Sequence, residues 1–149
     1  MKIALGSDHG GFSLKKEIIK YLEKKNIEVT DFGTYTQDSC DYPDYAIKVA
    51  EEVAGGNFEF GIIVCGTGIG VSIVANKVPG IRAALCSDTF SAHATRQHNN
   101  ANILTLGARV VGEGLVLDIV EVFITAKFEG ARHQKRIDKI TEIEKRYSK

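Results

Sequence analysis

Residues 60–66 read FGIIVCG, an apolar and largely β-branched run that ends at a glycine. A run of this kind is typical of a central strand that is buried on both faces of a parallel sheet. Similar apolar runs lie on either side of it in the chain, at 2–6, 27–33, 81–87 and 101–107. We therefore predict five strands, with 60–66 inside the sheet.

Amphipathic segments fill the intervals between these strands. In residues 12–25, Leu14, Ile18 and Leu22 recur every four positions, and the lysines lie mostly on the opposite face. Further helices are expected from about 43 to 54, from 70 to 77, from 88 to 98, over 113–127 and over 132–147. Strands that alternate with helices predict an α/β fold, a three-layer sandwich whose Rossmann-like parallel five-stranded sheet has helices on both faces.

Polar residues mark two of the helix starts. Asp41 precedes Pro43, which suits the first turn of a helix, and Ser87 or Asp88 is expected to cap the helix that follows the fourth strand. The last helix has a narrow apolar face, formed by Ile137, Ile140, Ile143 and Tyr147. A face this narrow makes the last helix a candidate for a subunit interface.

Composition limits the classes of function. The 149 residues include 44% hydrophobic and 26% charged residues, and 19 Lys and Arg balance 19 Asp and Glu. One domain over 1–149 is expected, because a chain of this length buries a single core of ordinary size. A net charge of zero is unfavourable for nucleic-acid binding or for an anionic membrane surface. There is no run of roughly 18 apolar residues and no signal-peptide core near Met1, so we expect a cytoplasmic protein.

The three cysteines, Cys40, Cys65 and Cys86, are widely spaced and form no CxxC pair. A disulfide framework, a zinc ribbon and a paired-cysteine redox centre are therefore not favoured. His93 and His98 are five positions apart, a poor spacing for a shared metal, and there is no HExxH motif. We predict neither a metal nor a cofactor.

In a parallel α/β sheet, ligands bind beyond the carboxyl ends of the strands. The stretch CGTGIGVS (65–72) stands at such a place, between the buried strand and the next helix. Its glycines expose consecutive backbone amides, which can hold a phosphate or an enolate oxygen beside the Cys65 thiol. A tight turn over a buried cysteine would use the same glycines. The spacing does not fit a Walker A loop. Val71 also excludes the other two motifs, because GxGxxG would need glycine at this position and a cysteine phosphatase loop would need arginine.

Three further clusters each have a functional and a purely structural interpretation. Asp8 and His9 follow the first strand, where Asp8 would also serve as a helix cap. His98 can act as an acid or base near neutral pH, or can simply complement the end of its helix. Arg132 and Arg136 lie four positions apart, so their guanidinium groups can clamp one phosphate or form a solvated basic face. Taken together, thiol, amides, histidine, carboxylate and arginines predict one site for proton transfer beside the carbonyl of a sugar phosphate.

Several segments in order resemble the ribose-5-phosphate isomerase B family, which is grouped with galactose- and allose-6-phosphate isomerases. They are MKIALGSDHGGFSLK (1–15), DYPDYA (41–46), GIIVCGTGIGVSIVANKVPGIRAAL (61–85), TRQHNNANIL (95–104) and GARHQKR (130–136). The resemblance covers essentially the whole chain. It implies a metal-free interconversion of D-ribose 5-phosphate and D-ribulose 5-phosphate through a cis-enediolate, within pentose phosphate metabolism. It also implies a homo-oligomer, a dimer or a tetramer, with active sites shared between subunits.

The resemblance further implies a role for each matching residue. Cys65 would move the proton between C2 and C1, and His98 would open the furanose ring with help from Asp8. The enediolate oxygen would be stabilised by Thr67 and the amides of Gly66, Gly68, Ile69 and Gly70. The phosphate would be bound by His9, Arg132 and Arg136, with further substrate contacts from Tyr42, Asn99 and Arg109. The alternatives are a hexose-6-phosphate isomerase with the same residues, and a non-catalytic phosphate- or nucleotide-binding module that needs neither Cys65 nor His98.

Overall fold

Five parallel strands carry the fold, and all of them end at the same edge of one sheet. In a computed structural model that describes residues 1–149, the strands are β1 (Lys2–Ser7), β2 (Glu28–Asp31), β3 (Phe60–Cys65), β4 (Ala83–Leu85) and β5 (Ile103–Gly107). Their order in space is β2-β1-β3-β5-β4. The five predicted strands are confirmed, although β4 is shorter than the predicted 81–87 because it lies at the edge and pairs with β5 alone.

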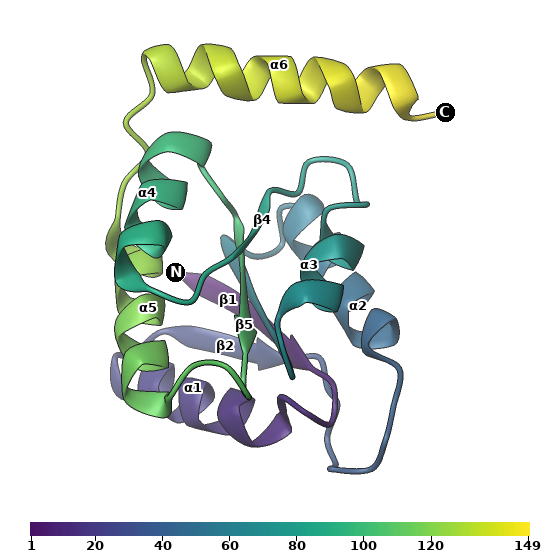
Figure 1. The fold of residues 1–149 in the computed structure, drawn as a ribbon, viewed down its shortest axis with the longest axis vertical. Helices are drawn as coiled ribbons and strands as arrows, with labels where there is room; N and C mark the ends of the chain where they lie inside the picture. The colour runs from purple at the N-terminus through teal and green to yellow at the C-terminus, as the bar shows by residue number, and fades with distance from the viewer.

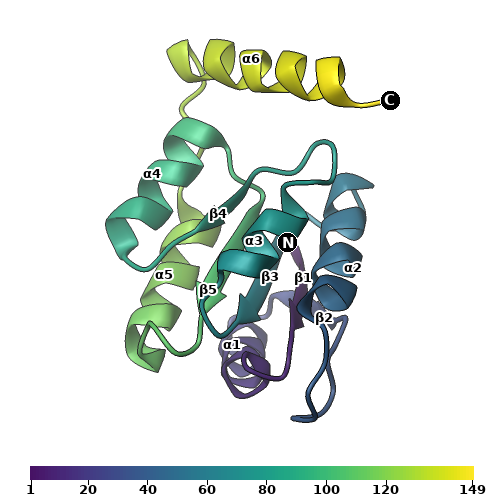
Figure 2. The same cartoon turned by 45° about the vertical axis from the view of Figure 1, so that its right-hand side comes forward.

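Helices cover both faces of this sheet (Figure 1). They are α1 (Phe12–Lys24), α2 (Tyr42–Ala54), α3 (Ile69–Ala75), α4 (Thr89–Asn99), α5 (Glu113–Thr125) and α6 (Arg132–Tyr147). The first, fourth and fifth lie on one face, and α2 and α3 lie on the other, so the predicted three-layer arrangement is confirmed. The sixth helix belongs to neither layer, and Figures 1 and 2 show it running across one end of the molecule.

Side chains of β3 divide between two cores. Phe60, Ile62 and Val64 join α1, α4 and α5 in the larger cluster, whereas Ile63 and Cys65 join α2 and α3 in the smaller one. Every residue of the strand is buried. Since full burial of one aliphatic side chain contributes about 1.5–3 kcal/mol, this strand is a main source of stability.

The two predicted caps have different outcomes. Asp88 caps α4, because its Oδ1 accepts a hydrogen bond from the Ser91 amide at 2.6 Å and its Oδ2 accepts one from the Ser91 hydroxyl. These bonds lower the pKa of the Asp88 carboxyl. Asp41 stands at the cap position of α2, but its side chain makes no capping bond, so that expectation is wrong. Pro43 in the first turn of α2 needs no amide partner and supports the start of the helix by itself.

One lysine of α1 departs from the predicted polar face. Lys15 is fully buried, and its ammonium pairs with the Asp31 carboxylate at 2.7 Å and donates to the Thr34 carbonyl. The Asp31 carboxylate also accepts from the Gly33 amide at 2.9 Å. The lysine thus joins α1 to the chain that leaves β2, and this chain leads toward the candidate site.

Candidate active site

A crevice is expected between the carboxyl ends of β1 and β3. The chain leaves β1 for β2 on one side and returns to form β3 on the other, which is the point where α/β sheets bind ligands. The loops after the two strands come close together here, since a β-carbon at Gly10 would lie 3.4 Å from the amide nitrogen of Gly66. Polar residues of both loops therefore share one place.

Cys65 is the last residue of β3, and its side chain is 5% exposed. Its sulfur accepts a hydrogen bond from the Gly68 amide at 3.0 Å. Gly68 has a φ of 77°, and a β-carbon there would lie 2.5 Å from Leu85 Cδ1 and 2.8 Å from the Leu106 carbonyl carbon. A glycine is therefore required for the turn that aims this amide at the sulfur.

The four amides predicted to hold an oxyanion do not all have the same freedom. The Gly68 amide is bound to the Cys65 sulfur, and the Ile69 amide donates to Thr67 Oγ1 at 3.3 Å. The amides of Gly66 and Gly70 donate to no protein acceptor. Because Thr67 Oγ1 accepts from Ile69, its hydroxyl proton remains available, so three donors are left for a ligand oxygen.

Asp8 and His9 face the crevice from the end of β1. Asp8 is 8% exposed, and its Oδ1 accepts from the Gly11 amide at 3.0 Å, which is a local bond at the start of α1 of the kind a cap makes. Nδ1 of His9 accepts from the backbone amide of Cys40 at 3.2 Å. Because a backbone amide only donates, Nδ1 carries no proton in this arrangement, and the ring proton is on Nε2. Nε2 is therefore the ring nitrogen that can donate to a ligand.

Tyr42 and Arg109 flank the glycine-rich loop from opposite sides. A β-carbon at Gly70 would lie 2.8 Å from the Tyr42 ring, and one at Gly66 would lie 3.3 Å from Arg109 Nη1. The Arg109 amide also donates to the Gly66 carbonyl at 3.0 Å. The structure thus gathers ten predicted residues at the carboxyl edge: Asp8, His9, Tyr42, Cys65, Gly66, Thr67, Gly68, Ile69, Gly70 and Arg109.

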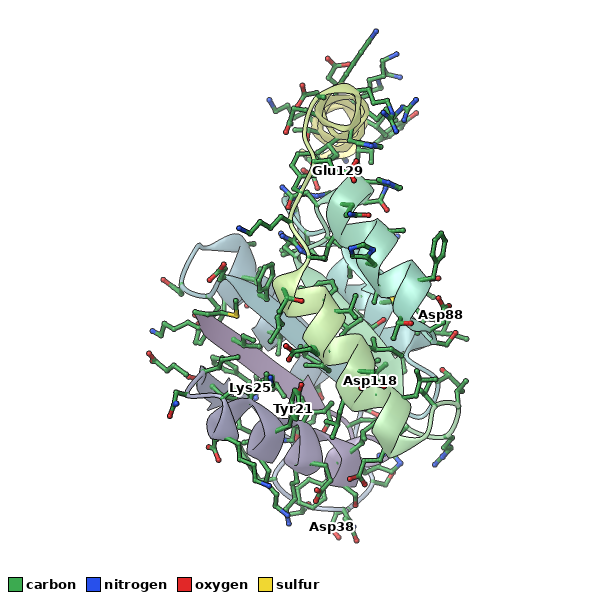
Figure 3. All side chains as sticks on the ribbon, turned by 90° about the vertical axis from the view of Figure 1, so that its left-hand side faces the viewer. Tyr21, Lys25, Asp38, Asp88, Asp118 and Glu129 are labelled. Atoms are coloured by element: carbon green, nitrogen blue, oxygen red, sulfur yellow. The ribbon has the colours of Figure 1, made fainter.

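The other four predicted residues, His98, Asn99, Arg132 and Arg136, lie at the opposite edge. The helix α4 begins after the end of β4 and returns across the sheet to the edge where β4 starts. Its end lies near Arg82, the residue before β4, whose Nε donates to the Asn99 carbonyl at 3.0 Å. In Figure 3, the labelled Asp88 lies at the start of α4. The labelled Glu129, which belongs to the segment before α6, lies beside the end of α4. At about 3.3 Å per residue, a six-residue strand separates the two edges by roughly 20 Å. The sequence left open which site residues come from a neighbouring subunit, and in this structure these four lie far from the Cys65 of their own chain.

The buried guanidinium of Arg96 supports the end of α4, where His98 and Asn99 lie. The Arg96 guanidinium lies over the Phe60 ring, 4.6 Å from its centroid, and donates to the Ala101 carbonyl at 2.6 Å. It also donates to Asn100 Oδ1 at 2.9 Å. The sequence places Arg96 beside His98 but gave no sign of this internal role, because arginine is rarely buried unless it is paired.

A second group of polar side chains surrounds His98. Its ring stacks on that of His133, with centroids 4.4 Å apart and planes 15° apart. Nε2 of the buried His133 lies 3.3 Å from Glu129 Oε2. Burial lowers the pKa of His133, and the charges of His98 and Arg132 lower it further, so this ring is neutral near pH 7.

The same three residues resemble a metal-ligand set, since their donor atoms lie within 4.8 Å of one another. The nitrogen lone pairs of an imidazole lie in the ring plane. Because the two ring planes are nearly parallel, their lone pairs do not converge on one point, as a tetrahedral ion requires. The arrangement fits a stacked pair better than a metal centre.

A hollow of about 670 Å³ lies beneath α6 and away from Cys65. Ile140, Ile143 and Tyr147 of α6 line it, and they are 49%, 54% and 78% exposed. Of the predicted apolar face of this helix, Ile137 alone is buried. The rest of that face is exposed in the single chain.

Comparisons with known proteins identify the family of this chain. A model of the family described as Ribose/Galactose Isomerase matches residues 3–140. The chain is 52% identical to ribose-5-phosphate isomerase B of Escherichia coli over 145 residues, which is 97% of each protein. No helix of the structure is both long and apolar enough to cross a membrane.

Solved structures of similar proteins have the same fold. Ribose-5-phosphate isomerase B of Clostridium thermocellum is 57% identical, with a TM-score of 0.98 over 99% of this chain and 100% of that one. The enzyme of the same name from Mycoplasma genitalium, solved with bound ribulose-5-phosphate, is 46% identical, with a TM-score of 0.94 over 97% of this chain and 96% of that one.

Proposed function

Because this chain belongs to the ribose/galactose isomerase family, we propose that it interconverts D-ribose 5-phosphate and D-ribulose 5-phosphate. The observation that carries the proposal is the surroundings of Cys65. Its sulfur is bound by the Gly68 amide, and two unpaired amides and the Thr67 hydroxyl lie in the same loop. A proton acceptor beside donors for a developing oxyanion is what proton transfer next to a carbonyl requires.

The reaction moves one proton between two carbons. The Cys65 thiolate removes the C2 proton of the open-chain aldose, and the electron pair of that bond forms the C1–C2 double bond of a cis-enediolate while the C1 oxygen becomes negative. The thiol then returns the proton to C1 as the C2 hydroxyl loses its own proton and becomes the ketone carbonyl. Since the C1 oxygen gains a proton, no atom or electron is lost.

Oxyanion stabilisation supplies most of the rate acceleration, because the C2–H group of the sugar is a much weaker acid than a thiol. The Thr67 hydroxyl and the amides of Gly66 and Gly70 are the donors that have no other protein acceptor. Each such donor typically contributes about 3–4 kcal/mol to the transition state. His9 donates from Nε2 to the phosphate, and Tyr42 and Arg109 lie on either side of the substrate.

The four residues at the opposite edge reach the active site from a second copy of the chain. One chain keeps His98, Asn99, Arg132 and Arg136 far from its own Cys65, so a complete site takes these four from a neighbour. The exposed apolar face of α6 supports this arrangement, because a face formed by Ile140, Ile143 and Tyr147 is unfavourable in water. In such a site His98 opens the furanose ring, and Arg132 and Arg136 clamp the phosphate.

The deciding experiment measures ribulose 5-phosphate formation from ribose 5-phosphate in the presence of a chelator. We expect turnover by the wild type and none by Cys65→Ala, with substrate binding retained in the variant. Cys86→Ala is the matched control, since it removes a buried thiol outside the site. Turnover of allose or galactose 6-phosphate but not of ribose 5-phosphate would change the substrate and keep the chemistry. Full activity of Cys65→Ala would refute the thiol base.

A further inference from the structure

We propose that the buried His133 is a positioning residue for His98, and that its ring is the surface on which the His98 ring is oriented. This inference rests on the proposed function, in which His98 opens the sugar ring. It adds a requirement that the reaction itself does not reveal, namely that the acid–base imidazole is aligned by a second imidazole that contacts no substrate.

The contact between the two rings is specific. Their centroids are 4.4 Å apart and their planes differ by 15°, which is the geometry of a stacked pair. His133 is 5% exposed, so its ring is fixed by its surroundings, whereas His98 lies at the end of α4. The fixed His133 ring therefore limits the orientations that the His98 ring can take.

The Glu129 carboxylate lies beside the buried His133 ring. Nε2 of His133 is shielded from solvent, has no hydrogen bond that meets full geometric criteria, and lies 3.3 Å from Glu129 Oε2. The Glu129 backbone amide donates to the Gln97 carbonyl at 3.1 Å. The residue next to His133 Nε2 is thus bound through its backbone to the helical turn that carries His98.

The charges around His133 keep the stack free of repulsion. The groups that face it are His98, Arg132 and Arg136, which are cationic or become so, and Glu129, which is anionic. Burial and the three cationic groups favour the neutral ring. A neutral His133 therefore adds no positive charge beside His98 when His98 holds the proton that opens the ring.

The test separates ring opening from proton transfer. Ribulose 5-phosphate is an open chain, because its C5 oxygen is esterified and cannot close a five-membered ring on the C2 carbonyl. Exchange of its C1 protons with deuterated solvent requires Cys65 but no ring opening. We measure this exchange and the turnover of ribose 5-phosphate for wild type, His133→Ala, His133→Phe and Glu129→Gln.

We expect His133→Ala to lower kcat for ribose 5-phosphate by about tenfold or more, since misalignment of a catalytic group by roughly 1 Å is costly. Its C1 exchange rate should stay within about twofold of wild type. His133→Phe keeps a flat ring and should recover most of the turnover, and Glu129→Gln should show a smaller loss of the same kind. His93→Ala, an exposed histidine of the same helix, is the control that changes neither rate.

Two results would overturn the inference. Unchanged turnover in His133→Ala would show that the stack has no function, and an equal loss of turnover and exchange would show a general role in folding or assembly. A wild-type protein that converts no ribose 5-phosphate would instead refute the proposed function, so the two failures are distinguishable.

Discussion

The backbone amide of Cys40 donates to Nδ1 of His9 at 3.2 Å, so a residue of the loop before α2 decides which nitrogen of a proposed phosphate ligand carries the proton. The Cys40 sulfur lies 3.8 Å from the same nitrogen, but its contact is weaker and replaceable. The backbone, and not the thiol, is therefore the important part of Cys40.

This relationship predicts different outcomes for two substitutions of Cys40. Cys40→Pro removes the amide proton and should raise KM about 5- to 10-fold, the effect of losing one hydrogen bond of about 1 kcal/mol. Cys40→Ala keeps the amide and should retain wild-type kinetics. Imidazole ¹⁵N shifts of His9 should show an unprotonated Nδ1 in the wild type and in Cys40→Ala, but a mixture in Cys40→Pro. An equal KM for all three proteins would contradict this role.

Thr67→Ala should lower kcat by about 10²- to 10³-fold with little change in KM, because an oxyanion donor acts chiefly in the transition state. Thr67→Ser keeps the hydroxyl and is the matched control. Steady-state kinetics with ribose 5-phosphate measures both effects. A large rise in KM at constant kcat would show instead that Thr67 binds substrate and transition state alike.

Cys86 should be the least reactive of the three cysteines. Burial raises its pKa to about 11, and Asp88 adds to the shift, so the neutral thiol persists through the physiological range. Alkylation depends on the thiolate and should therefore increase for Cys86 only as the pH rises toward that value. Mass spectrometry of protein labelled with iodoacetamide over a pH series resolves each site. Rapid labelling of Cys86 near neutral pH in the folded protein would contradict its burial.

Lys15→Met should destabilise the protein by about 1–3 kcal/mol, because it leaves the Asp31 carboxylate and the Thr34 carbonyl without their partner. Lys16→Met, at the exposed neighbouring position of the same helix, should change stability by less than about 0.5 kcal/mol. Urea unfolding followed by circular dichroism gives both values. Similar stabilities for the two variants would show that the buried ion pair contributes nothing.

Subunits that are inactive for different reasons should restore one another. In a dimer with shared sites, a mixture of Cys65→Ala and His98→Asn chains forms a hybrid with one intact site. Random exchange in equal amounts should therefore give about a quarter of wild-type activity, from the symmetry of a two-fold interface. Neither variant alone should be active, and mixing without exchange of subunits is the control. No recovery after confirmed exchange would place His98 and Cys65 in the same chain.

Much of the fold follows from local patterns in the sequence. The apolar run at 60–66 predicted the central strand, and the predicted helix at 132–147 has the bounds of α6. The group at the carboxyl edge was also predictable, because Asp8, Cys65 and Arg109 each lie at or within two residues of the end of a strand. Position along a strand determines the edge at which a residue lies, and this can be counted along the chain.

The rest depends on contacts that local patterns do not encode. Which site residues come from which subunit could not be read from the sequence. A helix between parallel strands returns to the starting edge, so its two ends lie apart and His98 lies far from the Cys65 of its own chain. Lys15 looks like a surface lysine until Asp31 and Thr34 are brought to it by the sheet. A signal for His133 was present, since it precedes Ile137 by one helical turn and both are buried.

Successive side chains of β3 point to opposite faces of the sheet, and this limits which changes of sequence the strand can accept. Cys65 is in the smaller core because its position is odd, and Val64 is in the larger one because its position is even. Substitutions within the strand change volumes but leave this parity intact. An insertion or deletion of one residue would move the sulfur to the opposite side of the sheet and exchange the contents of both cores. Descendants of this sequence can therefore alter the side chains of this strand one at a time, but not its length.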